Sequence, residues 1–227
     1  MKRITLVAIL TIFFITSCIY SSKMKKNSID SQPLYVPNED ELHKNPFMKE
    51  AAIHNKTSLD RFSSSYKSNV YFNKRELLAM INAIRVSGTY CAPATSPLRL
   101  NKYLEQAAIS HARDMALNNF LSHIGSGTSS DPARKAPGVG SNFMERIIFF
   151  GYPMRAYDLV GENVTLTKTK RQRLSIKKHF QKALKLYVED PPHCKILMNP
   201  RFRDVGIGVY KKGKKYYWVM DLGEIEK

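Results

Sequence analysis

The sequence is poor in acidic residues, in cysteine and in long apolar runs. Its 227 residues hold 19 Asp and Glu against 36 Lys and Arg, which gives a formal net charge of +17. Such a charge attracts nucleic acid, anionic lipid head groups and acidic polysaccharide, and it says little about fold. The basic residues are not interleaved with aromatic side chains as in a single-strand binder, so we do not expect nucleic acid as a partner. We expect an anionic envelope surface or a glycan instead.

The apolar run at the start of the chain spans residues 4–15 and follows two basic residues. It is too short to cross a bilayer comfortably, and its layout is that of a secretory signal peptide. The motif Ile15-Thr16-Ser17-Cys18 resembles a bacterial lipobox, in which the cysteine is acylated and becomes the new N-terminus. We therefore predict a signal peptide over residues 1–17 and lipidation of Cys18. The protein would be anchored to a bacterial membrane, facing the periplasm or the cell surface. Cleavage without a lipid and an uncleaved anchor are the alternatives.

Residues 18–68 have the composition of a flexible tether, rich in Ser, Asn, Lys and Pro and without a sustained apolar period. One short helix near residues 46–54 is expected within it. The folded domain is predicted to cover residues 69–227.

Helical and strand patterns follow one another in that domain, which predicts the α+β class. Apolar residues three and four positions apart predict helices over 74–86, 102–119, 143–151 and 170–187, with Asn73 and Asn101 as N-caps of the first two. Strands are expected over 158–166, 205–210 and 216–222, the last two joined as a hairpin at Lys212-Gly213.

Two further features of the domain lead to predictions. His111 lies on the apolar stripe of the second helix, so we expect a packing histidine there and not a ligand. Residues 125–141 are rich in Gly, Ser and Pro and form a segment long enough to be mobile.

The junction between the fourth helix and the following strand concentrates polar chemistry. Glu189, Asp190, His193 and Cys194 fall within six residues of sequence, and function usually lies at such junctions. The prolines at 191 and 192 predict that the helix stops there and that His193 is held on a stiff corner. Further on, the glycines at 206 and 208 remove side chains from one strand face, so that another element can lie close against it.

The three cysteines divide into one lipidation candidate and one pair. With Cys18 acylated, Cys91 and Cys194 remain, an even pair in an exported protein, and we predict a disulfide between them. Free thiols are one alternative, and metal ligation by Cys194 beside His193 is another.

Several short motifs occur in one order along the domain. They are Leu98-Arg-Leu-Asn101, His111-Ala-Arg-Asp-Met115, Ser122-His123, Gly161-Glu162-Asn163, Pro192-His193 and Tyr217-Trp218-Val-Met-Asp221. Their joint order resembles the CAP superfamily, or SCP domain, of cysteine-rich secretory, antigen 5 and pathogenesis-related proteins, and most of all its bacterial secreted branch. The resemblance implies a three-layer α-β-α sandwich with a small antiparallel sheet.

The resemblance also implies a cleft lined by two histidines and one or two acids. By position, His123 and His193 match the two histidines, and Glu162 matches the glutamate of the Gly-Glu-Asn motif. The second acid has no sure counterpart, and the candidates for it are Glu145, Glu189 and Asp190.

A cleft of this kind suits Zn²⁺ or another divalent metal, because imidazoles supply nitrogen ligands and carboxylates supply charge. The predicted ligands are His123, Glu162 and His193, with Glu145, Glu189 and Asp190 as further candidates. A metal with an open position would lower the pKa of a bound water and permit hydrolysis. Without a metal, His123, Glu162 and His193 are the candidates for general acid and base catalysis, but no nucleophile is evident. A hydrogen-bonded structural cleft is the alternative.

Three functions follow as hypotheses. The first is an extracytoplasmic envelope lipoprotein whose CAP domain binds a lipid, peptide or glycan in the cleft, with residues 125–141 as a lid. The second is a metal-assisted, peptidase-like hydrolase using the same cleft. The third is adhesion or scaffolding through the basic face. The sequence leaves the ligand, the metal and the oligomeric state open, and it predicts no cofactor besides a metal.

Overall fold

The computed structural model describes residues 66–155, 158–169 and 174–224. The predicted signal peptide, Cys18 and the short helix near residues 46–54 lie outside this part of the chain. The elements in chain order are α4 (Lys74–Ser87), β1 (Arg99–Leu100), α5 (Lys102–Asn118), α6 (Phe143–Phe149), β2 (Val160–Lys168), α7 (Ile176–Glu189), α8 (Pro191–Met198), β3 (Asp204–Lys212) and β4 (Lys215–Gly223). Among the helices of the described ranges, none has the length and apolar character needed to cross a membrane.

The four strands form one sheet in the order β1-β3-β4-β2. β4 pairs antiparallel with both β3 and β2, and the predicted hairpin joins β3 to β4 through Gly213, whose φ is 58°. The sheet is mixed, because β1 pairs with β3 in parallel over two residues. We expected antiparallel strands alone, but a strand of two residues leaves no alternating pattern in the sequence. Its parallel direction is possible because helices lie between the two strands along the chain.

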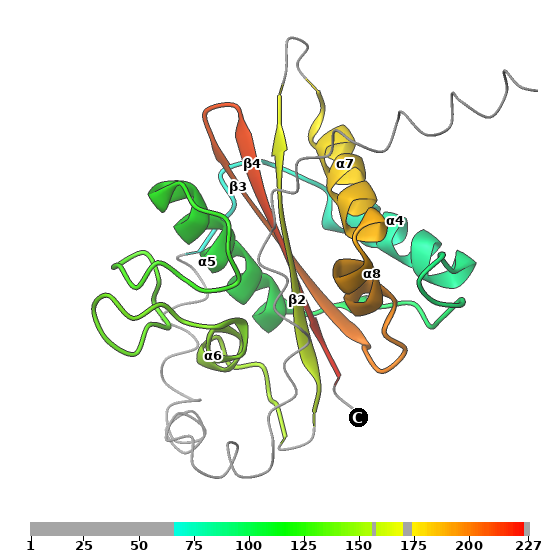
Figure 1. The fold of residues 1–227 in the computed structure, drawn as a ribbon, viewed down its shortest axis with the longest axis horizontal. Helices are drawn as coiled ribbons and strands as arrows, with labels where there is room; N and C mark the ends of the chain where they lie inside the picture. The colour runs from blue at the N-terminus through cyan, green and yellow to red at the C-terminus, as the bar shows by residue number, and fades with distance from the viewer. Residues whose placement is uncertain (1–65, 156–157, 170–173, 225–227) are drawn as a thin grey trace, which may run out of the picture.

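Helices cover both faces of the sheet and give the predicted three layers (Figure 1). α5 and α6 lie on one face, and α4, α7 and α8 lie on the other. α5 approaches β3 very closely. A Cβ atom added to Gly206 would lie 2.0 Å from the carbonyl carbon of Leu104, and one added to Gly208 would lie 2.2 Å from that of Ala108. This confirms the prediction that the two glycines let another element lie against the strand.

Most helix ends follow the sequence signals, but α7 begins at Ile176, after its N-cap Ser175, and not at residue 170 as predicted. The side chains of Asn73 and Asn101 accept hydrogen bonds from backbone N–H groups in the first turns of α4 and α5, as predicted. α7 ends at Glu189, before the two prolines, but these prolines also begin α8. Proline is tolerated in a first helical turn because its missing N–H has no helical partner there. His193 therefore lies in the first turn of a helix that the sequence did not predict.

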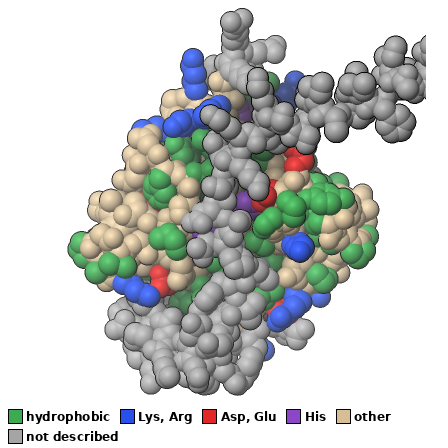
Figure 2. All heavy atoms as spheres, viewed as in Figure 1, with side chains coloured by type: hydrophobic (Ala, Val, Ile, Leu, Met, Phe, Trp, Pro, Cys, Tyr) green, Lys and Arg blue, Asp and Glu red, His purple; other side chains and the backbone are tan. Residues whose placement is uncertain are grey.

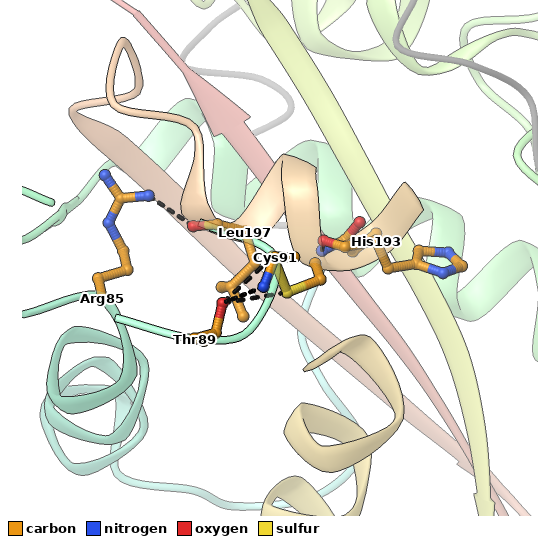
Figure 3. Close-up of a disulfide and its surroundings, with 7 residues drawn as sticks. Arg85, Thr89, Cys91, His193 and Leu197 are labelled. Carbon is orange, nitrogen blue, oxygen red and sulfur yellow. Dashed lines mark hydrogen bonds between the residues drawn. A yellow bond between two sulfur atoms is a disulfide. The ribbon is translucent and has the colours of Figure 1, made fainter. Parts of the chain in front are cut away.

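The predicted disulfide between Cys91 and Cys194 is present, with Cα atoms 6.2 Å apart. It joins the loop after α4 to α8, and the hydroxyl of Thr89 lies beside both sulfur atoms. Figure 3 shows that His193, although next to Cys194 in sequence, points away from the disulfide. The bond therefore fixes the helix that carries His193 without lying against its ring.

Candidate functional site

Three residues predicted for the cleft lie together in the structure. His123 comes from the loop after α5, Glu162 from β2 and His193 from α8. The Nδ1 atom of His123 lies 2.9 Å from Oε1 of Glu162, and the two imidazole rings face each other with centroids 6.0 Å apart. All three side chains are buried.

Glu162 is held by a buried arginine that the sequence did not single out. Nη2 of Arg146, on α6, donates to Oε2 of Glu162 at 2.9 Å and to the carbonyl of His123 at 2.8 Å. Burial alone would raise the pKa of Glu162, but Arg146 and the neighbouring histidines outweigh it and hold that pKa below its ordinary value. Both carboxylate oxygens of Glu162 thus have a donor.

His193 is positioned by a separate set of contacts. Its Nδ1 donates to Asp190, a carboxylate that is 46% exposed, and its backbone carbonyl accepts a bond of 3.0 Å from Asn163 of the Gly-Glu-Asn motif. The ring of Tyr187 packs beside it with centroids 5.7 Å apart. Burial lowers the pKa of His193 although Asp190 acts to raise it, which favours the neutral ring with an unprotonated Nε2.

The other candidate acids have different partners. Glu145 completes a capping box with Asn142 at the start of α6 and pairs with Lys135 at 2.5 Å. Glu189 lies at the exposed end of α7, 3.5 Å from Lys185. Of these candidates, Asp190 is therefore the acid that the structure joins to a histidine.

The donor set fits a metal in part. Within residues 66–155, 158–169 and 174–224, no three or more His, Cys, Asp or Glu side chains are grouped as metal ligands would be. Glu162 and Asp190 each bind the Nδ1 of a histidine, which is how carboxylates orient metal-binding imidazoles from outside the coordination shell. The Nε2 atoms of His123 and His193 could thus serve as two ligands. Zinc binding stays a prediction, with Glu162 and Asp190 in supporting positions.

A second layer of titratable groups lies behind the site. Asp221 is paired in register with Glu162 across β2 and β4, is fully buried, and has its carboxyl group close to that of Glu162. Its burial and the neighbouring Glu162 raise its pKa well above the ordinary value. His111 is buried as predicted and donates from Nε2 to the carbonyl of Ser122 at 2.8 Å. Burial, helped by Arg146, lowers its pKa to about 4.

A groove lies away from the histidines, between α4 and α7, with a volume of about 720 Å³. It is lined by Met80, Ala83, Ile84, Ser87, Gly88, Thr89, Tyr90, Gln181, Leu184, Lys185, Val188 and Glu189. Thr89 and Tyr90, in the loop that carries Cys91, form part of its lining.

The segment 125–141 is anchored by two buried carboxylates. Asp114 accepts a bond of 2.8 Å from the backbone N–H of Ser126, and Asp131 accepts one of 2.8 Å from that of Ser141. The hydroxyl groups of the same two serines donate to these carboxylates as well. The contacts do not favour the lid that its composition suggested.

Comparison with known proteins identifies the family. The model of the cysteine-rich secretory protein family, CAP, matches residues 78–222. The chain is similar to an extracellular protein with an SCP domain from Bacillus anthracis, at 22% identity and a TM-score of 0.47 over 66% of this chain and 40% of that one. It therefore spans less than half the length of that protein.

Two further solved structures are similar at low identity. The match to an outer surface protein from Borrelia burgdorferi has 14% identity and a TM-score of 0.48 over 70% of this chain and all of that one. The match to a venom allergen-like protein from Schistosoma mansoni has 14% identity and a TM-score of 0.36 over 75% and 88%. A search among curated protein sequences found no match. On the family model, which covers most of the domain, the chain belongs to the CAP family.

Proposed function

We propose that the protein is an extracytoplasmic binding module that captures a single-chain amphiphile, such as a fatty acid, in the groove between α4 and α7. The groove carries this proposal. Its volume of about 720 Å³ lies within the roughly 300–1,000 Å³ of typical small-molecule sites. The proposed ligand site is therefore this groove, and not the histidine cleft that the sequence analysis predicted.

The lining of the groove favours an acyl chain over a glycan. Met80 and Ile84 from α4 face Leu184 and Val188 from α7, and sugar hydroxyls buried against such side chains would lose their hydrogen bonds to water. Lys185 stands at the rim, where its ammonium group can meet an acidic head. Its present partner Glu189 is exposed and 3.5 Å away, a kind of ion pair that contributes little and can be replaced.

An extracytoplasmic location agrees with the disulfide, since such bonds persist mainly in oxidising compartments. The bond between Cys91 and Cys194 and membership of a family of secretory proteins support export. We propose that residues 1–17 are the export signal and that Cys18 carries the lipid anchor.

Metal-assisted hydrolysis is the second candidate, and the facing imidazoles of His123 and His193 favour it. These rings would hold the metal, while Glu162 and Asp190 would orient them. A zinc ion bound there would supply an activated water. Catalytic zinc sites have three protein ligands, whereas this site offers two. The hydroxyl oxygen of Ser122 accepts a bond from the N–H of Ile124 at 3.0 Å and so has a structural role.

Fatty-acid binding to the full chain tests the first proposal. Ala83 lines the groove and is exposed on α4, whereas Ala79, one turn earlier, is exposed and outside the groove. In a fluorescent fatty-acid displacement assay we expect Ala83→Trp to weaken binding at least about tenfold, because an indole would fill the space of the acyl chain. Ala79→Trp and His123→Ala/His193→Ala should bind as the unmodified protein does. Equal affinity of Ala83→Trp and Ala79→Trp would contradict the proposal.

Zinc titration by calorimetry tests the second candidate. Stoichiometric binding that is lost in a folded His123→Ala/His193→Ala variant would support the metal site. Absence of binding by the unmodified protein would remove the zinc hydrolase.

A further inference from the structure

Two stretches of the chain contain basic residues and no acids. Between Glu162 and Glu189, and again between Asp204 and Asp221, the sequence has no Asp or Glu. The first stretch covers most of β2 and α7, and the second covers the hairpin of β3 and β4. The positive charge of the protein is thus unbalanced in these two stretches.

The fold brings these stretches to one end of the sheet. In the strand register, Lys168 of β2 and Lys212 of β3 both pair with Lys215 of β4. The start of α7 is fastened to the same end by His179. Its ring nitrogens lie 3.0 and 3.1 Å from the hydroxyls of Thr167 and Thr169.

The charges of α7 and of the hairpin act on the same buried group. The pKa of His179 is lowered by its burial and then by Lys182 of α7 and Lys211 of the hairpin. We call this surface the lysine end, and it consists of Lys168, Lys177, Lys178, Lys182, Lys211, Lys212, Lys214 and Lys215. Figure 2 shows Lys and Arg side chains gathered at the corresponding end of the molecule, at the top of the view.

Little of this charge is neutralised inside the domain. In the described ranges, Lys177 is the member of the lysine end with an ion pair, to Glu76 at 2.6 Å. The ammonium of Lys212 donates to the carbonyl of Leu117 at 2.9 Å, and that of Lys211 lies 5.4 Å from the ring centroid of Tyr216. Both contacts leave the positive charge in place.

Exposed apolar side chains flank the lysine end. Tyr71 is 92% exposed, and the side chain of Asn69, two residues earlier, forms two hydrogen bonds with the backbone of Lys211. Leu117, whose carbonyl binds Lys212, is 42% exposed. Exposed apolar side chains contribute little to the binding of a soluble polyanion. At a bilayer surface, tyrosine and leucine enter the interface while neighbouring lysine ammonium groups contact the lipid head groups.

We propose that the lysine end binds the anionic surface of a lipid bilayer, with Tyr71 and Leu117 entering the head-group region. Each lysine near such a surface strengthens binding several-fold, and the effect falls off within a Debye length. This contact orients the domain so that the lysine end faces the membrane. None of its lysines lines the amphiphile groove, which takes other residues of α7, from Gln181 to Glu189.

Vesicle co-sedimentation of the full chain tests this proposal. Three exposed lysines, from β2, from α7 and from the turn between β3 and β4, are replaced in Lys168→Gln/Lys182→Gln/Lys214→Gln. The matched control, Lys102→Gln/Arg155→Gln/Lys195→Gln, removes the same charge from exposed positions elsewhere. The vesicles are phosphatidylcholine with or without about 30% phosphatidylglycerol.

On anionic vesicles at low salt we expect the lysine-end variant to bind at least about tenfold more weakly, and the control variant to bind nearly as the unmodified chain does. Any binding through the N-terminus is the same in all three proteins. Equal losses in the two variants would overturn the proposal, since charge alone would then matter and not its place.

A second variant separates a bilayer from a soluble polyanion. Tyr71→Ser/Leu117→Ser keeps every charge, and both side chains are exposed, so the fold should persist. We expect it to bind anionic vesicles several-fold more weakly and to bind heparin as the unmodified chain does. Heparin binding without vesicle binding, or vesicle binding that this variant does not change, would overturn the proposal.

Discussion

The two histidines of the site are held in different ways. His123 is fixed by a buried ion pair, because Arg146 binds both its carbonyl and the Glu162 carboxylate that accepts from its ring. His193 is fixed by the chain itself, in a helix that starts with two prolines and carries a disulfide at the next residue. Its acid, Asp190, is half-exposed. One ring thus depends on buried charge, and the other on covalent and steric restraint.

This difference predicts where the site is fragile. We call His123 with Glu162 and Arg146 the His123 half of the site, and His193 with Asp190 the His193 half. A buried charge that loses its partner is costly, so breaking the ion pair of the His123 half should destabilise the whole fold. The His193 half should tolerate changes at its exposed acid and respond mainly to loss of the disulfide. Each substitution below acts on one half and leaves the other as an internal reference.

Arg146→Ala should have the largest effect. It leaves Glu162 charged and buried without its cation, and we expect a loss of about 5 kcal/mol in the free energy of unfolding. Urea denaturation measures it, with Arg155→Ala, at an exposed position, as the control. A loss below about 1 kcal/mol would show that Glu162 finds another partner and that the His123 half is not held by charge.

Removal of the disulfide should come next. The bond closes a loop with a sequence separation of 103 residues, and Cys91→Ser/Cys194→Ser should cost on the order of 4 kcal/mol in the chain-entropy picture. NMR spectra of the imidazoles should show a shift of the His193 resonances while those of His123 stay in place. Equal shifts of both rings would mean that the two halves are not held separately.

Acid should weaken the protein through His111, behind the His123 half. Its pKa is lowered from 6.5 to about 4 in the folded state, so the unfolded chain binds the proton more readily. The contribution of this group to the free energy of unfolding is fully present above its pKa of 6.5 in the unfolded chain. It is lost as pH falls from 6.5 toward 4, by about 3 kcal/mol. His111→Gln should have a correspondingly flatter pH profile in thermal unfolding. An unchanged profile would contradict the role of His111.

Asp190→Asn should have the smallest effect on stability, below about 1 kcal/mol, because the carboxylate is solvent-screened. If His123 and His193 bind zinc, however, the same change should lower zinc affinity by about tenfold or more, since a carboxylate that orients a ligand is lost. Denaturation and calorimetry of the same preparation separate the two effects. A large loss of stability would show that the His193 half also depends on charge.

Features set by local chemistry were predictable from the sequence. The Asn73 and Asn101 caps, the close approach at Gly206 and Gly208, and the pairing of Cys91 with Cys194 all follow from rules about single residues. The meeting of His123, Glu162 and His193 required the family resemblance, because long separations carry no spacing signal.

What was missed depends on tertiary contacts. A lone arginine on a short helix looks like surface charge, and nothing in the pattern around Arg146 shows that it binds Glu162. The prolines before His193 indicate the end of one helix as readily as the start of the next, so α8 was not predicted. The groove between α4 and α7 arises from the packing of two separate helices and has no counterpart in a motif.

Photo-crosslinking with a diazirine-bearing fatty acid tests the central claim most directly, because it reports where on the full chain an amphiphile is held. We predict crosslinks to peptides of α4 and α7, at residues such as Ala83 and Leu184 that line the groove, and their loss with an excess of unlabelled fatty acid. Crosslinks that cluster around His123 and His193 instead, or labelling that the competitor does not reduce, would contradict the assignment of the groove as the ligand site.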